Sequence, residues 1–118
     1  MLDFIGKEIK VGDWIAGGGS GNSSAEYGMI LYLVREVTED RLKLTRLKVT
    51  YPQHTRESAE VHVRKMSATN SNRYVVVKPA AKVKALFKRA LNDNLRPGDA
   101  QFIGTWIHGS GNNGQVFA

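Results

Sequence analysis

The residues with the clearest capacity for chemistry are cations that gather in one part of the chain. Residues 61–92 carry eight Lys and Arg side chains and no Asp or Glu. Residues 1–60 and 93–118 each carry a net charge of −1, so the formal net charge of +6 comes from the middle segment. An acid-free basic run of this length indicates a surface that binds a polyanion. The alternative is a solvated basic face that serves solubility alone.

Nucleic acid is the polyanion whose requirements these residues meet. A sequence-independent binder of single strands needs a basic groove for the backbone and aromatic platforms for the bases. The acid-free segment supplies the candidate cations Arg64, Lys65, Arg73, Lys78, Lys82, Lys84, Lys88 and Arg89. A second basic ladder is predicted on the outer face of a strand at 41–50, formed by Arg41, Lys43, Arg46 and Lys48. The candidate platforms are Tyr74, Tyr51, Trp14 and Trp106, and packing in the core is the alternative for each of them.

The preference for single strands over duplex comes from a missing pattern. No helix-turn-helix, zinc-finger or basic-zipper sequence is present to enter a major groove. A twisted sheet with glycine-rich loops suits a flexible strand better. The sequence does not distinguish DNA from RNA.

Catalytic and metal chemistry lack the necessary combinations of residues. There is no cysteine, which excludes disulfides, thiolate zinc sites and cysteine nucleophiles. His54, His62 and His108 lie far apart, with no carboxylate or second histidine at ligand spacing. No pair of acids is placed for acid–base work. We therefore expect a non-enzymatic protein without catalytic residues, metal or cofactor.

Two glycine-rich stretches resemble phosphate-binding loops only by letter. Residues 17–24 lack the lysine of a Walker loop and are expected to form an exposed loop. Residues 109–114 match G-x-G-x-x-G, but no helix or βαβ unit is predicted after them. Neither stretch supports a nucleotide-binding fold.

Short apolar runs bounded by turn residues predict the elements that position the cations. Strands are expected to include 4–6 and 14–16, followed by 28–37, 41–50, 61–66 and 73–78, with 102–107 a candidate last strand or docking segment. Within 41–50 the apolar alternation slips at Thr45–Arg46, which predicts a β-bulge.

The periodicity changes after the last of these strands. Pro79 is predicted at the first position of a helix over 79–92. Its apolar stripe consists of Val83, Leu86, Phe87, Ala90 and Leu91. Lysines and an arginine flank that stripe, and the alternative to a binding role is a core-covering helix whose cations are only solvated.

These elements predict a mainly β fold: five or six antiparallel strands curled into a small SH3-like or OB-like barrel, with one C-terminal amphipathic helix. A single domain over 1–107 includes the helix, and the Gly/Asn-rich residues 108–118 are expected to form a flexible tail. Neither a signal peptide nor a membrane-spanning apolar run is recognisable. We therefore expect a soluble, cytoplasmic protein with no membrane partner.

The first residues carry a resemblance to a known group of proteins. Residues 3–13, Asp-Phe-Ile-Gly-Lys-Glu-Ile-Lys-Val-Gly-Asp, follow the pattern D-F-x-G-x-E-I-x-V-G-D. This stretch resembles the opening of many small virulent-phage proteins, where it leads into a β-barrel. Among them the chain is similar to the Drc-type single-stranded-DNA-binding cofactors of phage transcription. The signature covers about a tenth of the chain and marks the start of a barrel rather than an activity.

The resemblance implies a host-cytoplasm setting, binding of single-stranded DNA as a homo-oligomer, and a link to RNA polymerase. One departure is visible at the other end of the chain. Replicative single-strand binders usually end in an acidic tail that recruits partners, whereas residues 114–118 carry no acid. That mode of recruitment is therefore in doubt for this chain.

Two functions from different classes follow from these observations. The first is sequence-independent binding of single-stranded DNA, in support of phage transcription. The alternative is a protein-interaction module that binds and redirects an acidic host protein. Both use the basic segment, and the nature of the partner separates them.

Overall fold

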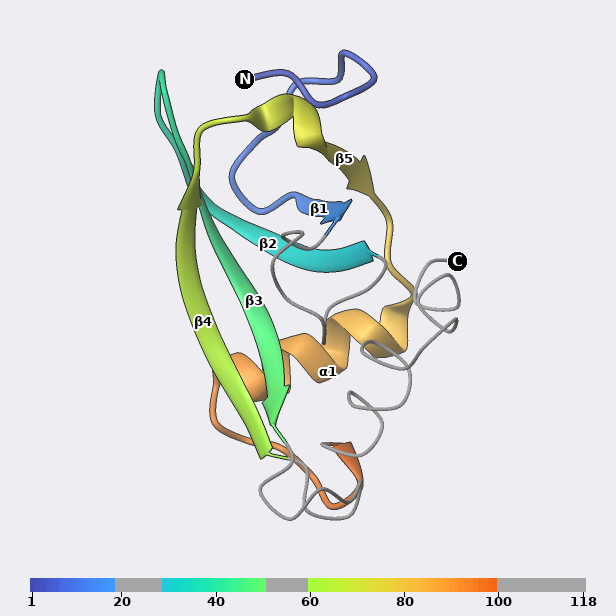
Figure 1. Ribbon diagram of the computed structural model, residues 1–118. Coiled ribbons are helices and arrows are strands. Elements are labelled where there is room, and N and C mark those ends of the chain that lie inside the picture. Colours follow the sequence, from blue (N-terminus) through green and yellow to red (C-terminus); the bar gives the residue numbers. More distant parts are fainter. Residues whose placement is uncertain (19–28, 51–59, 100–118) are drawn as a thin grey trace.

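The computed structural model describes residues 1–18, 29–50 and 60–99 (Figure 1). Several predictions fall outside these residues. They concern the candidate strand at 102–107, the tail at 108–118, the two aromatic platforms Tyr51 and Trp106, and the histidines His54 and His108.

The described chain forms one antiparallel sheet and one helix. The strands are β1 (Trp14–Gly18), β2 (Met29–Val37), β3 (Leu42–Thr50), β4 (Glu60–Ala68) and β5 (Tyr74–Val77), with the helix α1 at Ala81–Leu91. A short 3-10 turn, η2 (Ser71–Arg73), connects β4 to β5. The strand order is β4-β3-β2-β1-β5, and every neighbouring pair is antiparallel. The predicted mainly β fold is confirmed, as a curled sheet rather than a closed barrel.

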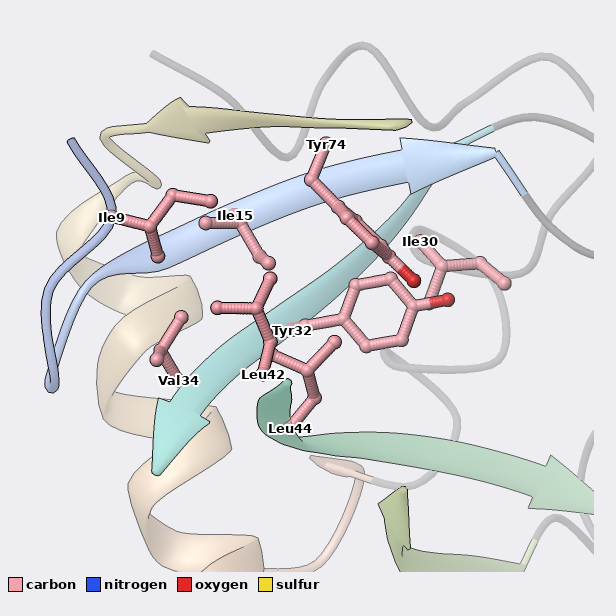
Figure 2. Packing of buried hydrophobic residues seen from close by; sticks show 8 residues of the cluster. All are labelled: Ile9, Ile15, Ile30, Tyr32, Val34, Leu42, Leu44 and Tyr74. Carbon is pink, nitrogen blue, oxygen red and sulfur yellow. The ribbon is translucent and has the colours of Figure 1, made fainter. Parts of the chain in front are cut away.

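Both faces of the sheet are packed, each against different residues. One cluster lies inside the curl and is formed by Ile9, Ile15, Ile30, Tyr32, Val34, Leu42, Leu44 and Tyr74 (Figure 2). The other lies between the opposite face and α1, and consists of Leu31, Leu47, Val83, Leu86, Phe87 and Ala90. Trp14 contacts the edge of Phe87 in this second cluster, with ring centroids 4.9 Å apart. The helix is therefore held by apolar burial along one stripe.

The predicted bulge at Thr45–Arg46 is wrong. β3 pairs with β4 without interruption from Leu42, opposite Ala68, to Thr50, opposite Glu60. The apolar alternation slips because β3 changes the face that it buries: Leu44 belongs to the cluster inside the curl, whereas Leu47 belongs to the cluster under α1. The register irregularity lies instead in β2, between Val34 and Glu36.

The helix begins two residues later than predicted. Ala80 is the N-cap, and its carbonyl accepts hydrogen bonds from the backbone N–H groups of Val83 and Lys84. Pro79 is buried just before it, in the extended segment that leads from β5. Four residues of the predicted stripe are buried, whereas Leu91, in the last turn, is 36% exposed. The helix still ends next to Asn92, as the pattern indicated.

Residues 17 and 18, expected to open a glycine loop, belong to a strand instead. Gly17 and Gly18 are the last two residues of β1, and Gly17 lies opposite Tyr74 of β5. A Cβ atom at position 17 would come within 2.7 Å of Cδ1 in the Tyr74 ring. Glycine is present there because the ring packs directly on the strand backbone.

The first thirteen residues form a loop against β5, and the strand predicted at 4–6 is absent. The buried carboxylate of Asp3 accepts hydrogen bonds from the backbone N–H groups of Ile5 (3.0 Å), Lys7 (2.8 Å) and Val76 (2.8 Å). The Phe4 N–H also donates to the Tyr74 carbonyl, at 2.8 Å. These contacts occupy backbone groups on the outer edge of β5, so the loop protects that edge from pairing with another strand.

Most of the D-F-x-G-x-E-I-x-V-G-D signature has a role in this loop. Gly6 and Gly12 have φ angles of 85° and 89°, which favour glycine. The Asp13 carboxylate accepts the Lys10 N–H at 2.8 Å, and Ile9 is 2% exposed in the core. The signature therefore encodes a local fold that closes one edge of the sheet.

Candidate nucleic-acid interface

The acid-free segment does not form one continuous surface. Successive side chains of a strand point to opposite faces, so Arg64 and Lys65 of β4 diverge. Arg64 lies opposite Arg46 of β3, whereas Lys65 lies opposite Thr45 on the face that carries α1. Lys78 follows β5, which is at the other end of the strand order from β4. The cations that are contiguous in sequence are thus distributed over the fold.

The ladder predicted along β3 is divided in the same way. Lys43 shares its face with Lys65 and makes an ion pair with Glu36 of β2, at 3.3 Å. Arg46 and Lys48 lie on the opposite face. The prediction assumed a bulge that would have kept these side chains together, and the uninterrupted register of β3 separates them.

The helix cations lie on two flanks of the buried stripe. Lys82 and Arg89 are seven residues apart and share one flank, whereas Lys84 and Lys88 are four apart and share the other. The buried stripe lies between the two flanks on the side that faces the sheet.

Arg89 is also engaged within the fold. Its Nε and Nη2 atoms donate to the two carboxylate oxygens of Asp99, at 3.0 and 3.1 Å. This pairing lowers the pKa of Asp99 and raises that of Arg89. Asp99 lies beyond the acid-free segment in sequence, so its proximity to Arg89 is a product of the tertiary fold.

The two predicted aromatic platforms within the described residues both pack in the core. Tyr74 is 9% exposed and contacts the Tyr32 ring edge-on, with centroids 5.4 Å apart. Burial raises the pKa of the Tyr74 phenol, and the nearby charge of Arg73 offsets part of that rise. Trp14 is half-buried against Phe87. Core packing, the alternative considered for each aromatic residue, is what the structure shows for both.

Two predicted cations from distant parts of the chain do meet. Arg41, just before β3, and Arg73, at the end of η2, line one pocket of about 310 Å³. Its described lining consists of Arg41, Ser67, Ala68, Thr69, Asn70, Arg73 and Tyr74. There is no carboxylate among these residues. Guanidinium, hydroxyl and amide donors in one pocket are the groups that bind phosphate oxygens.

The backbone around the pocket is held by local hydrogen bonds. Thr38 Oγ1 accepts the Arg41 N–H at 3.1 Å, and the Thr38 N–H donates to the Arg41 carbonyl at 2.9 Å. The same hydroxyl donates to the Asp40 carboxylate, the nearest acid in sequence. On the other side, the Arg73 N–H donates to the Asn70 carbonyl at 3.2 Å. Hydrogen bonds within turns therefore hold the backbone at both arginines.

A row of basic side chains continues from the pocket along β3 and β4. Ala68, at the pocket, shares one sheet face with Met66, and that face then carries Arg64 with Arg46 opposite, and His62 with Lys48 opposite. Because a strand rises about 3.4 Å per residue, the row from Ala68 to His62 extends about 20 Å. Arg46 is buried, with 8% of its surface accessible, so the accessible basic side chains of this face are Lys48, His62 and Arg64, which we call the basic row. Glu60, 3.9 Å from His62, lies at its far end.

Phe4 is a candidate that sequence reasoning missed. Of the five aromatic residues in the described chain it is the only exposed one, with 72% of its surface accessible. Its N–H bonds to the Tyr74 carbonyl, which places its backbone one residue away from Arg73. The signal was present in the N-terminal signature, where Asp3, Gly6 and Ile9 maintain the fold and Phe4 does not.

No family model, curated protein or solved structure matches this chain. The chemistry of the pocket and its surroundings therefore carries the functional argument. Within the described residues no group of three or more His, Cys, Asp or Glu is placed to hold a metal ion, and no helix is long and apolar enough to cross a membrane.

Proposed function

We propose that this protein binds single-stranded DNA without sequence preference and without catalysing a reaction. The pocket of Arg41 and Arg73 holds a backbone phosphate, and Phe4 stacks on a base. The observation that carries the proposal is the convergence of two arginines in a pocket whose described lining has hydrogen-bond donors and no carboxylate.

The chemistry of the pocket favours phosphate. A guanidinium group presents a planar fork of donors that pairs two phosphate oxygens at once, and such charge-assisted bonds are about twice as strong as neutral ones. The hydroxyl and amide groups of Ser67, Thr69 and Asn70 are available for the remaining oxygens. From the pocket, the basic row offers a path for the following phosphates along β3 and β4.

The shape of the site favours a single strand. A duplex reader inserts a helix or a strand ribbon into a groove, whereas Arg41 and Arg73 lie outside α1 and outside the strands. Exposed aromatic rings are typical of proteins that stack unpaired bases, and stacking tolerates every base. Lack of sequence preference follows from that tolerance.

The setting of this activity is proposed on the resemblance alone. We infer that the protein acts in the cytoplasm of a phage-infected host, as a homo-oligomer, in support of transcription by RNA polymerase. The N-terminal signature D-F-x-G-x-E-I-x-V-G-D supports this setting.

The proposal is tested by titrating fluorescent oligonucleotides and following their anisotropy. Single-stranded DNA, the matching duplex and the RNA of the same sequence are compared at two salt concentrations. We expect the single strand to bind more tightly than the duplex, with an affinity that falls steeply with salt. Equal affinity for duplex and single strand, or an affinity that salt does not change, would contradict the proposal.

Replacement of Phe4 tests the stacking platform. Because base–aromatic stacking contributes about 1–3 kcal/mol per base, Phe4→Ala is expected to weaken single-stranded DNA binding by about ten-fold or more. The melting temperature should stay unchanged, since the ring is 72% exposed. The matched control is Ile5→Ala, the exposed neighbour, which should keep full affinity. Wild-type affinity in Phe4→Ala would remove Phe4 from the site.

A second candidate is a module that binds an acidic host protein. It is favoured by the exposed apolar pair Phe4 and Ile5, 72% and 68% accessible, because such pairs also occur in protein docking surfaces. A pull-down from host lysate with and without nuclease separates the two functions. Partners that survive nuclease treatment and are lost in Phe4→Ala favour this second candidate, and partners released by nuclease favour the first.

A further inference from the structure

The two edges of the sheet differ in whether a described segment covers them. The outer edge of β5 is occupied by the N-terminal loop through the Asp3 carboxylate and the Phe4 N–H. β4 lies at the other edge, and among the described residues it pairs only with β3 (Figure 1). Its nine residues, Glu60–Ala68, thus form a long edge that no described segment covers. Long uncovered edges are templates for pairing with another strand, and proteins usually protect them.

We propose that β4 pairs antiparallel with β4 of a second copy of the chain, across a two-fold axis at His62. In such a pairing, residues directly opposite must lie on the same face of the joined sheet, so the axis passes through a residue position rather than between two. With the axis at His62, Glu60 meets the partner's Arg64 and Val61 meets the partner's Val63. Each of these contacts occurs twice because the interface is symmetric.

Charge selects this register over its neighbours. An axis at Arg64 places the two Arg64 side chains opposite each other, and an axis at Val63 places His62 opposite the partner's Arg64. Only the His62 register of these three joins Glu60 to an arginine. Directly opposite charges stabilise a strand pair, whereas like charges destabilise it.

Apolar exposure supports the same register. Val63 is 39% exposed on the face that carries α1, an unusual position for a large apolar residue at the centre of a strand. Val61, on the same face, packs against the cluster under the helix. Pairing Val63 with the partner's Val61 extends that cluster across the axis and removes the exposed apolar surface from water.

The resulting dimer has ten described strands in one sheet. Both copies turn the same face to the same side, so the two pockets of Arg41 and Arg73 lie on one side of the joined sheet. The dimer itself does not depend on DNA binding, and its test is carried out on the full chain without nucleic acid.

A single cysteine reports the register directly, because the chain has none of its own. Opposite residues of an antiparallel pair have Cβ atoms about 4.5–5.5 Å apart, close enough for a disulfide, whereas positions four residues out of register are about 13 Å apart. His62→Cys is therefore expected to form a disulfide-linked dimer under mild oxidation, and the matched control Arg64→Cys to remain largely monomeric on reducing-agent-free gels. Faster cross-linking of Arg64→Cys than of His62→Cys would overturn the register.

Charge exchange tests the interface without a covalent bond. Sedimentation equilibrium is expected to give twice the chain mass of 13.1 kDa for the natural sequence. Glu60→Arg and Arg64→Glu each place like charges opposite and should raise the dimer dissociation constant about ten-fold, while the double exchange E60R with R64E should restore it. A chain that stays monomeric at every concentration, or a double exchange that fails to restore the dimer, would overturn the proposal. Circular dichroism confirms that each variant is folded.

Discussion

Reversing both pocket charges, Arg41→Glu with Arg73→Glu, is expected to lower the affinity for single-stranded DNA by at least about a hundred-fold. Each lost guanidinium–phosphate contact removes a charge-assisted hydrogen bond of about 1.5–3 kcal/mol, and the new carboxylates repel the backbone. Both arginines are exposed, so the fold should be unaffected. Anisotropy titration measures the affinity, and thermal unfolding checks the fold.

Neutral substitutions give a finer test of the same contact. In Arg41→Ala with Arg73→Ala, the one phosphate held by the pocket is no longer neutralised, so the slope of log affinity against log salt should fall in magnitude by about 0.7 for a single strand. The matched control, Lys10→Ala with Arg96→Ala, removes the same charge from exposed positions outside the pocket and should keep the slope. Equal slopes in the two double variants would show that the pocket does not bind the backbone.

The cations of α1 distinguish the binding site predicted from the sequence from the pocket of Arg41 and Arg73. The basic segment in the sequence predicts that Lys82, Lys84, Lys88 and Arg89 together form part of the groove. The structure separates them on two flanks, with Arg89 paired to Asp99. A larger loss of salt dependence on their combined removal than in the pocket variant would favour a path along α1 over the pocket.

Asp3→Asn is expected to lower the free energy of unfolding at neutral pH by about 2–3 kcal/mol. The carboxylate accepts three backbone N–H groups, and an amide at that position supplies one acceptor and turns a donor toward the others. Because the side chain is only 4% exposed, water replaces few of the lost bonds. Urea unfolding at pH 7 measures the difference. Asp13→Asn, which affects a single hydrogen bond at a more accessible site, is the control and should lose less.

The same substitution should change how stability depends on pH. Burial raises the pKa of Asp3, whereas the hydrogen bonds from the backbone of Val76, Lys7 and Ile5 lower it. The lowering is the larger effect in sum, so the pKa of Asp3 lies below its ordinary value. The unfolded chain then takes up its proton first, and the contribution of Asp3 is complete above about pH 4 and lost as the pH falls toward the folded pKa. In Asp3→Asn this loss at acid pH should be smaller. Part of the loss of stability at acid pH should remain in Asp3→Asn, because Arg89 lowers the pKa of Asp99 as well.

Identical acid unfolding curves for the natural chain and Asp3→Asn would contradict the role given to the carboxylate. The result also bears on function, because Asp3 holds the loop that carries Phe4 next to Tyr74. If the loop loosens in Asp3→Asn, single-stranded DNA affinity should fall together with stability. If stability falls while the affinity for single-stranded DNA stays unchanged, the N-terminal signature stabilises the fold but does not contribute to DNA binding.

The elements of this fold could be read from the chain because their signals are local. Short apolar runs predicted β1 to β5 to within a few positions, although the strand predicted at 4–6 is absent. The spacing of Val83, Leu86, Phe87 and Ala90 predicted the buried face of α1. These periodicities reflect the geometry of a single strand or helix and need no knowledge of its neighbours. Arg41 and Arg73 were each predicted as binding residues on the same basis, from residue type and local element.

Long-range pairing decided the rest. Whether Thr45–Arg46 marks a bulge or a change of buried face depends on which elements cover β3, and those lie elsewhere in the chain. Cations next to one another in sequence diverge on opposite faces of β4, while Arg41 and Arg73 meet only because η2 and the end of β4 bring them to one pocket. Phe4 has an apolar side chain of the kind usually found in a core. It is exposed in the N-terminal loop, which Asp3 fixes to β5. Composition and spacing thus determine which elements form, whereas a shared surface exists only after distant strands have paired.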